Sequence, residues 1–260
     1  MATYLDRIVV AHRAAAAADE RPFEALREAA LAAPPVRPFA AALAAADRTA
    51  VIAEIKRRSP SRGALAPDLV AAELAARYQA GGATALSVLT DAEFFGGSPA
   101  DLAEARAACS LPVLRKDFTV DGRDVLDARI MGADAVLLIV AALDDDELAG
   151  LLALAHDVGL DALVEVHDEA EADRALAAGA SLVGVNQRDL TTFAVDGDRA
   201  RALAPRLAGA ALRVAESGIA GPHDVRALGR AGYDAVLVGE WLVTNADPAS
   251  ALGRLVGARA

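Results

Sequence analysis

Cysteine is nearly absent: Cys109 is the one cysteine among 260 residues, so no disulfide can form within the chain. Structural disulfides accumulate in oxidising compartments, and their absence fits a reducing one. Cys109 follows an alanine-rich helical segment and precedes a turn at 110–112. That setting favours a small buried or half-buried residue over a nucleophile. Disulfide-stapled secreted scaffolds are therefore excluded.

Long apolar runs are missing as well. The longest uncharged apolar stretch near the middle of the chain, Ala135 to Leu143, is far shorter than the ~20 residues that a membrane helix needs. Near the N-terminus, Asp6, Arg7 and Arg13 interrupt the apolar pattern that a signal peptide requires. We therefore expect a cytoplasmic protein with no membrane partner.

A surplus of positive charge is the third absence. The chain carries 26 Lys and Arg against 37 Asp and Glu, for a net charge of −11 and an isoelectric point near 4.8. Binding to nucleic acid needs a basic face, so we expect no nucleic-acid partner. A small anionic ligand is still compatible, because a local site can be positive on an acidic protein.

What the sequence does contain is a recurrent junction. Gly81, Gly132, Gly179 and Gly232 lie about 50 residues apart, each after a helical pattern and before a β-branched run. Glycine just past a helix adopts the left-handed conformation that other residues resist. Each copy therefore predicts a joint between a helix and the strand that follows it.

Further apolar runs lie between these joints. Together they give eight strand candidates, near 51–55, 84–89, 112–115, 134–140, 162–166, 182–186, 212–216 and 235–238. Strands that alternate with helices predict an α/β fold with a parallel sheet, and eight such units at this length predict a (β/α)8 TIM barrel. A doubly wound open sheet is the alternative, weakened because no G-x-G-x-x-G follows the first strand. We expect residues 1–260 to form a single TIM-barrel domain, with residues 1–48 as an N-terminal helical extension.

The active site of such a barrel lies at the C-terminal ends of its strands. The stretch VIAEIKRRSPSRG (51–63) begins as a buried strand, and Glu54 and Lys56 point the same way because side chains alternate along a strand. The other strand ends add Lys116, Glu165, Asn186, Glu216 and Ser217. Buried charges are costly unless paired. Two lysines and three carboxylates at one mouth therefore indicate catalysis more than a structural ion-pair network.

Glycine-containing loops follow the last two strands, at Ser217-Gly218 and at Gly239-Glu240. In TIM barrels these loops often cradle a phosphate with backbone N–H groups, although a glycine can also merely permit a tight turn. The loop at 59–62, with the sequence SPSR, adds hydroxyl groups and positive charge on the same face. Together these loops predict a phosphate site.

The remaining polar and aromatic candidates give weaker indications. Four histidines share no metal-like spacing: His12, His156, His167 and His223. We expect them on the surface or on helices. The acidic run at 144–147 is expected to cap a helix rather than to bind a metal. Phe94 and Phe95, after the second strand, are expected to be exposed on the active face, where exposed aromatic pairs mark a binding surface.

Seven motifs, in chain order, carry a family resemblance. They are IAEIKRRSPSRG (52–63), FFGGS (94–98), PVLRKDF (112–118), ALVEVH (162–167), GVNQRDL (184–190), AESGI (215–219) and VLVGE (236–240). The chain resembles the indole-3-glycerol-phosphate synthase family from about Leu5 onward, and the first motif is the most specific. The resemblance implies a (β/α)8 lyase of tryptophan biosynthesis that needs no cofactor and no metal. Its reaction converts 1-(2-carboxyphenylamino)-1-deoxyribulose 5-phosphate to indole-3-glycerol phosphate, CO2 and water.

The resemblance also implies roles for the charged residues. Lys56 meets the carboxylate on the substrate's anthranilate ring, and Glu54 holds Lys56 in place. Lys116 is the general acid that protonates the carbonyl oxygen during ring closure. Glu165 is the acid/base group of the later dehydration. A lysine suits the role of acid where burial and neighbours lower its pKa toward neutrality.

Positioning and binding roles follow for the other residues. The resemblance implies that Asn186, Glu216 and Ser217 position the substrate and its hydroxyl groups. Contacts to the phosphate or the aromatic ring are implied for Ser59, Phe95, Phe118, Leu137, Gly218, Gly239 and Glu240. For Glu240 the contact is the backbone N–H.

Several alternatives stay open from the sequence. Lys56 and Lys116 can exchange their roles. Another phosphate-binding barrel of the same pathway, phosphoribosylanthranilate isomerase or the tryptophan synthase α subunit, shares the phosphate loops but not the EIKRRSPS stretch. A Schiff-base aldolase would use Lys116 as its nucleophile, and a phosphosugar-binding module would bind without turnover. We expect a monomer whose partner is a small phosphorylated substrate.

Overall fold

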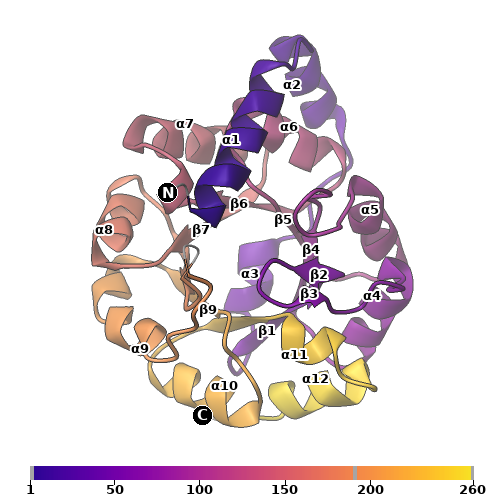
Figure 1. The fold of residues 1–260 in the computed structure, drawn as a ribbon, viewed down its shortest axis with the longest axis vertical. Coiled ribbons are helices and arrows are strands. Elements are labelled where there is room, and N and C mark those ends of the chain that lie inside the picture. Colours follow the sequence, from indigo (N-terminus) through magenta and orange to yellow (C-terminus); the bar gives the residue numbers. More distant parts are fainter. Residues whose placement is uncertain (1–2, 190–191, 259–260) are drawn as a thin grey trace.

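Eight parallel strands close into a barrel in the computed structural model, which describes residues 3–189 and 192–258 (Figure 1). In order around the barrel they are β1 (Ala50–Ile55), β10 (Ala235–Val238), β9 (Leu212–Glu216), β8 (Leu182–Asn186), β7 (Asp161–Val166), β6 (Ala135–Ile139), β5 (Val113–Lys116) and β4 (Ala85–Leu89). The barrel closes where β1 pairs with β10, with Ala50 in register with Ala235. Each strand overlaps the range predicted for it, so the expected (β/α)8 TIM barrel is confirmed.

Helices surround the barrel (Figure 1). They are α4 (Ala71–Ala80), α5 (Pro99–Ala108), α6 (Gly122–Ile130), α7 (Asp145–Asp157), α8 (Glu169–Ala177), α9 (Arg199–Leu203), α10 (Pro222–Arg230), α11 (Glu240–Val243) and α12 (Pro248–Val256), with 3-10 turns η1 (Val140–Ala142) and η2 (Arg206–Gly209). No helix among the described residues has the length and apolar content needed to cross a membrane.

The acidic run at 144–147 caps helix α7, as predicted. The Asp144 side chain accepts the backbone N–H of Glu147, and the Glu147 side chain accepts the backbone N–H of Asp144. This reciprocal arrangement satisfies donors that the first turn of a helix leaves free, and each such cap contributes about 1 kcal/mol.

Apolar side chains fill two layers, because residues alternate between the barrel interior and the surrounding helices. On β1, Ile52 belongs to the interior cluster, whereas Val51 and Ile55 pack against the helices. Cys109 is buried in the outer layer, as predicted. Burying an aliphatic side chain such as that of Ile52 stabilises a fold by roughly 1.5–3 kcal/mol. The charges at the strand ends therefore emerge from an otherwise apolar barrel.

Three helices precede the barrel: α1 (Tyr4–Ala17), α2 (Phe23–Ala32) and α3 (Phe39–Ala44). The predicted N-terminal helical extension is thus confirmed. Helix α3 covers the N-terminal end of the barrel, where Phe39 joins the interior cluster and the Ala40 N–H donates to Asp161 Oδ2 over 2.8 Å. Helix α1 lies toward the opposite end, drawn nearer to the viewer than the fainter α3 in Figure 1. The extent of one domain over residues 1–260 stays a prediction.

Two local predictions were wrong. In the first helix-to-strand joint the left-handed residue is Gly82 (φ 90°), not Gly81 (φ −76°). A glycine is required at position 81 by packing and not by backbone conformation, since a Cβ there would lie 2.7 Å from Ala249 O. The stretch after β1, predicted as a loop, contains the hairpin of β2 (Arg58–Ser59) and β3 (Gly63–Ala64).

Candidate active site

The C-terminal ends of the barrel strands open into a cavity of about 500 Å³. Every residue predicted for the site lines it: Glu54, Lys56, Ser59, Phe95, Lys116, Phe118, Leu137, Glu165, Asn186, Glu216, Ser217, Gly218, Gly239 and Glu240. These residues are far apart in the sequence, and the closed barrel brings them to one place. A cavity of this size suits a small molecule.

Lys116, the last residue of β5, lies between two buried carboxylates. Its Nζ is 2.9 Å from Glu165 Oε2 on β7 and 3.5 Å from Glu216 Oε2 on β9. Asn186, at the end of β8, donates from Nδ2 to Glu165 Oε1 over 3.1 Å. Glu216 Oε1 has no hydrogen-bond partner among the described residues. That oxygen is buried and packs against Gly184 of β8, and a buried carboxyl oxygen without a donor favours the neutral form of the group.

The protonation states of these groups follow from their mutual distances. Burial lowers the pKa of Lys116, but the charges of Glu165, Glu216 and Glu54 outweigh burial and raise it above its ordinary value. The condition stated above for an acid lysine, a pKa lowered toward neutrality, is therefore not the one found at Lys116. Lys116 is held as the ammonium, because the negative charge around it, that of Glu165 first, stabilises the positive form.

The two carboxylates beside Lys116 differ in their ionisation. Burial raises the pKa of Glu165, but Lys116 and His167 outweigh burial and lower it below its usual value. Burial also raises the pKa of Glu216, with help from Glu165 and Glu54 and against Lys116, to about 8. Environments that push two carboxyl pKa values apart are a common feature of acid–base sites.

Glu54 and Lys56 form a second ion pair at the end of β1. Lys56 Nζ contacts Glu54 Oε1, so the two side chains point the same way, as the strand period predicts. The Tyr78 hydroxyl of α4 donates to the Glu54 carbonyl oxygen over 3.2 Å. Gly239 makes room for the pair, since a Cβ there would overlap Glu54 Oε1 and lie 3.1 Å from Lys56 Nζ.

The loop after β9 turns through two residues with left-handed backbone. Ser217 has φ 64° and Gly218 has φ 71°. For a serine this conformation costs on the order of 1–3 kcal/mol. Gln187 Nε2 stabilises the turn by donating to the Ser217 carbonyl oxygen over 2.8 Å. Strain that neighbours maintain in this way is concentrated at functional sites.

Phe95, Phe118 and Leu137 form an apolar wall of the cavity. The rings of Phe95 and Phe118 lie 6.1 Å apart, centroid to centroid. The expectation that both adjacent phenylalanines are exposed is wrong for Phe94, which is 7 % exposed. Its ring packs edge-on against Tyr4 of helix α1, 5.8 Å away. The N-terminal extension therefore covers Phe94 and leaves Phe95 to the cavity.

Arg188 is a cavity residue that sequence reasoning missed. Its Nη1 donates to Ser61 Oγ over 3.2 Å, and its Nη2 lies 3.8 Å from Glu240 Oε2. Arg62 Nε lies 3.2 Å from the other oxygen of Glu240. Two guanidinium groups thus stand at the predicted phosphate loops. Arg188 follows Asn186 by two residues, and that spacing was the available signal.

His167 is the second missed residue. The expectation that it lies on the surface or a helix is wrong, because its side chain is only 11 % exposed. Its Nδ1 is 3.0 Å from Glu171 Oε2, and its Nε2 is 3.4 Å from Glu165 Oε1. Burial lowers the pKa of His167, but these two glutamates outweigh burial and raise it to about 10. A positive imidazolium therefore lies beside Glu165.

The prediction of a surface or helical position is confirmed for two further histidines. His156 and His223 are exposed on helices α7 and α10. Leu190, the last residue of the motif GVNQRDL, lies outside the described residues.

Solved structures of two other proteins share the fold at 19% sequence identity. A 3-hexulose-6-phosphate synthase superposes with a TM-score of 0.64 over 82% of this chain and 100% of its own. A thiamine phosphate pyrophosphorylase from Pyrococcus furiosus superposes with a TM-score of 0.60 over 80% of this chain and 93% of its own. At this identity the likeness supports the barrel fold alone.

Relatives by sequence are much more similar. The model of a family described as indole-3-glycerol phosphate synthase matches residues 5–255. The chain is 56% identical over 232 residues to indole-3-glycerol phosphate synthase 2 of Streptomyces coelicolor, covering 89% of this chain and 90% of the relative. It is 52% identical over 260 residues to the indole-3-glycerol phosphate synthase of Rhodococcus jostii, covering 99% and 96%. The chain belongs to the indole-3-glycerol phosphate synthase family.

Proposed function

We propose that the cavity at the C-terminal ends of the strands carries out the family's reaction, with Lys116 and Glu165 as its acid and base. The reaction closes the ring of 1-(2-carboxyphenylamino)-1-deoxyribulose 5-phosphate and releases CO2 and water to give indole-3-glycerol phosphate. It is a carboxy-lyase step of tryptophan biosynthesis. The observation that carries the assignment is Lys116 Nζ at 2.9 Å from an ionised Glu165, with Glu216 on its other side.

Substrate binding uses three parts of the cavity. The phosphate binds between the turn at Ser217-Gly218 and the start of α11, with Ser59 and the guanidinium of Arg188 nearby. The aromatic ring packs against the wall of Phe95, Phe118 and Leu137. The ring carboxylate binds Lys56, which exchanges part of its contact with Glu54 for the new anion. Lining residues of the matching chemistry support each placement.

Ring closure is the step that Lys116 assists. The ring carbon that bears the carboxylate attacks the ketone carbon, a carbon–carbon bond forms, and the carbonyl electron pair moves to oxygen. Lys116 then delivers a proton to this developing alkoxide. A lysine with a raised pKa donates poorly to a neutral ketone but readily to an alkoxide, so its proton transfer accompanies bond formation.

Decarboxylation and dehydration complete the sequence. After ring closure the nitrogen is cationic, so the carbon–carboxylate bond breaks, CO2 leaves, and the electron pair restores the aromatic ring. Glu165 then removes a proton from the carbon next to nitrogen while the hydroxyl group leaves as water after protonation. The overall change consumes one proton from solvent. A low pKa keeps Glu165 ionised and ready to act as this base.

The raised pKa of Lys116 also bears on the alternatives. A Schiff-base aldolase needs a neutral amine as nucleophile. An ammonium stabilised by Glu165, Glu216 and Glu54 does not supply one. Exchange of roles between Lys56 and Lys116 is disfavoured because Lys116, not Lys56, is within 4 Å of Glu165. A binding module without turnover would leave this buried charge arrangement without a purpose.

The test is a fluorescence assay with 1-(2-carboxyphenylamino)-1-deoxyribulose 5-phosphate, without added cofactor or metal. We expect indole emission that saturates with substrate, and a loss of about 10²–10⁴-fold in kcat for Lys116→Ala, the range of a general acid. Near-normal turnover in this variant would remove Lys116 from the mechanism. A covalent adduct trapped by borohydride would favour the aldolase, and binding without emission would favour the binding module.

The surroundings of the enzyme belong to the same proposal. The single cysteine supports a cytoplasmic location, and the net charge of −11 supports an enzyme that does not bind nucleic acid; a monomer is part of the same proposal. Size-exclusion chromatography with light scattering tests the oligomeric state.

A further inference from the structure

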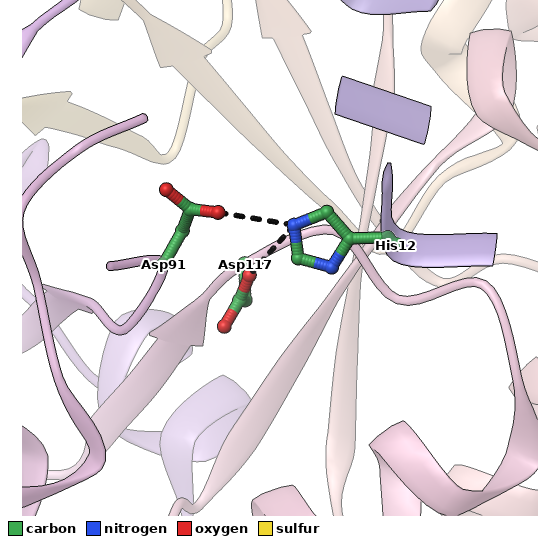
Figure 2. A group of neighbouring side chains, drawn as sticks. All are labelled: His12, Asp91 and Asp117. Atoms are coloured by element: carbon green, nitrogen blue, oxygen red, sulfur yellow. Dashed lines mark hydrogen bonds and ion pairs between the residues drawn. The ribbon is translucent and has the colours of Figure 1, made fainter. Parts of the chain in front are cut away.

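Helix α1 contacts the loops after β4 and β5 through His12. Figure 2 shows the imidazole pointing at the carboxylates of Asp91 and Asp117, which follow β4 and β5. His12 Nε2 lies 3.0 Å from Asp91 Oδ2 and 3.9 Å from Asp117 Oδ1. His12 lies on a helix, as predicted, but only 20 % of its side chain is exposed. We call His12, Asp91 and Asp117 the His12 clamp.

Asp91 links the clamp to the loop that carries Phe95. While its Oδ2 faces His12, its Oδ1 accepts the backbone N–H groups of Phe94 and Phe95 over 2.6 and 2.9 Å. One carboxylate therefore ties helix α1 to the backbone of Phe95. Phe95 is part of the apolar wall of the cavity.

Asp117 links the clamp to the other aromatic residue of that wall. Its Oδ1 accepts the backbone N–H of Phe118 over 2.9 Å, and its Oδ2 accepts from Thr90 Oγ1 and, over 3.0 Å, from Arg115 Nη2. The His12 ring itself lies 5.4 Å from the Phe118 ring. The His12 clamp thus holds the backbone of Phe95 and both the backbone and the ring of Phe118.

We infer that His12 is a positioning residue, which sets the places of Phe95 and Phe118 through Asp91 and Asp117. Helix α1 then contributes to substrate binding without touching the substrate. Rings that are fixed in advance need not be ordered when the substrate arrives, so the clamp improves affinity by lowering that cost. The inference rests on the proposed role of Phe95 and Phe118 as the wall for the substrate's aromatic ring.

A histidine and two aspartates could also suit a divalent cation, but the contacts favour an ion pair. The Asp91 carboxylate already accepts two backbone N–H groups, and the Asp117 carboxylate accepts three donors, one of them the Arg115 guanidinium. A metal such as zinc needs donor atoms at about 2.0–2.2 Å. It would have to displace donors on both carboxylates and would add positive charge beside Arg115.

The charges around His12 make the clamp sensitive to pH. Asp91 and Asp117 face it from the two loops, Asp124 faces it from α6, and Arg115 lies beyond Asp117. A hollow next to His12 is lined by the further charged residues Asp19, Arg21, Asp121 and Arg123. Burial lowers the pKa of His12, but the bond to Asp91 and the charges of Asp117, Asp91 and Asp124 outweigh burial and raise it.

The direction of the pH dependence follows from this shift. A histidine whose folded pKa is raised contributes fully while the pH is below its ordinary value near 6.5, and the contribution falls as the pH rises through the raised value. The clamp is therefore strongest on the acidic side. Neutral His12 can still donate one hydrogen bond to Asp91, so the clamp weakens at high pH but is not lost.

The experiment compares three variants in the fluorescence assay. We expect His12→Asn to raise KM about tenfold with a smaller change in kcat, since one charge-assisted hydrogen bond is lost. His12→Gln keeps a longer donor without the charge and should recover part of the loss. Arg13→Met is the matched control: it removes the contacts of Arg13 with Glu147 and Ala142, which anchor the same helix away from the clamp. We expect its KM to stay within about twofold of wild type.

The pH profile and a chelator complete the test. Wild-type KM should rise with pH through the raised pKa of His12, and this limb should be missing in both His12 variants. Equal KM values for wild type and His12→Asn, or an unchanged limb, would overturn the inference. So would loss of wild-type activity in EDTA that zinc restores, because the cluster would then be a metal site. An inactive wild type would instead contradict the proposed function.

Discussion

The substitution Gly184→Ala tests the geometry around Glu216 most directly. Gly184 lies on β8, in register with Val214 of β9, and the side chain of Glu216, two residues further along β9, packs over it. A Cβ at this position would overlap Glu216 Oε1, would lie 3.3 Å from Glu216 Cδ, and would lie 3.2 Å from Leu163 Cδ1. The carboxylate is therefore the group that has to move, and it moves relative to Lys116.

The expected magnitude follows from that collision. Forcing an extra methyl group into a filled core costs about 1–3 kcal/mol of unfolding free energy. A displacement of about 1 Å in a group that positions the reacting atoms can cost about 10²-fold in rate. We therefore expect kcat/KM to fall about a hundredfold, together with a loss of stability in the lower part of the core range.

Gly150→Ala provides the matched control. Gly150 lies in the exposed middle of helix α7, and a Cβ there would meet nothing within 4 Å. The same methyl group should raise the free energy of unfolding by about 0.5–1 kcal/mol, because alanine favours the helix, and should leave turnover unchanged. Urea unfolding and the fluorescence assay on both variants give the comparison. Wild-type turnover and stability in Gly184→Ala would refute the assigned crowding around Glu216.

Two further predictions concern protonation. Burial raises the pKa of Glu216 from 4.5 to about 8, so the folded state favours the protonated form of this side chain. The free energy of unfolding of the wild type should therefore fall as the pH rises from 4.5 to about 8. Urea unfolding at several pH values should show this fall in the wild type and not in Glu216→Gln. Glu171→Gln should lower the pKa of His167 from about 10, so that the imidazolium beside Glu165 is lost at a lower pH and the alkaline limb of the kcat profile moves to lower pH. The exposed Glu169→Gln on the same helix α8 should leave that limb in place, and equal limbs in both variants would contradict the link from Glu171 to Glu165.

The fold could be predicted because its signals are local. Each joint needs a glycine just past a helix, each strand is an uninterrupted apolar run, and the alternation of the two admits few architectures. The cavity residues could also be found, since a TIM barrel gathers the ends of all its strands at one face. Lys116, Glu165 and Glu216 were identifiable for this reason without any knowledge of their distances.

What sequence reasoning could not give depends on distances between segments that are remote in the chain. The pKa of Lys116 is raised and not lowered because three carboxylates from β1, β7 and β9 lie around it. Phe94 is buried because Tyr4 of α1 covers it. His167 is half-buried between Glu165 and Glu171. Its spacing of two residues places it on the same face as Glu165, but the sequence does not show that Glu171 of α8 lies against it.

The pairing of β1 with β10 has a consequence for folding during translation. Translation releases Ala50 long before Ala235, its partner in the barrel seam. Until β10 emerges, the seam edge of β1 presents unpaired backbone groups, which is the kind of edge that promotes association with other nascent chains. Gly239, against which the Glu54–Lys56 pair packs, arrives only after β10. A chain whose synthesis stops before β10 therefore contains most of the helices but no complete catalytic centre. Enzymatic activity should appear only when β10 has been synthesised, and not in proportion to the length of the nascent chain.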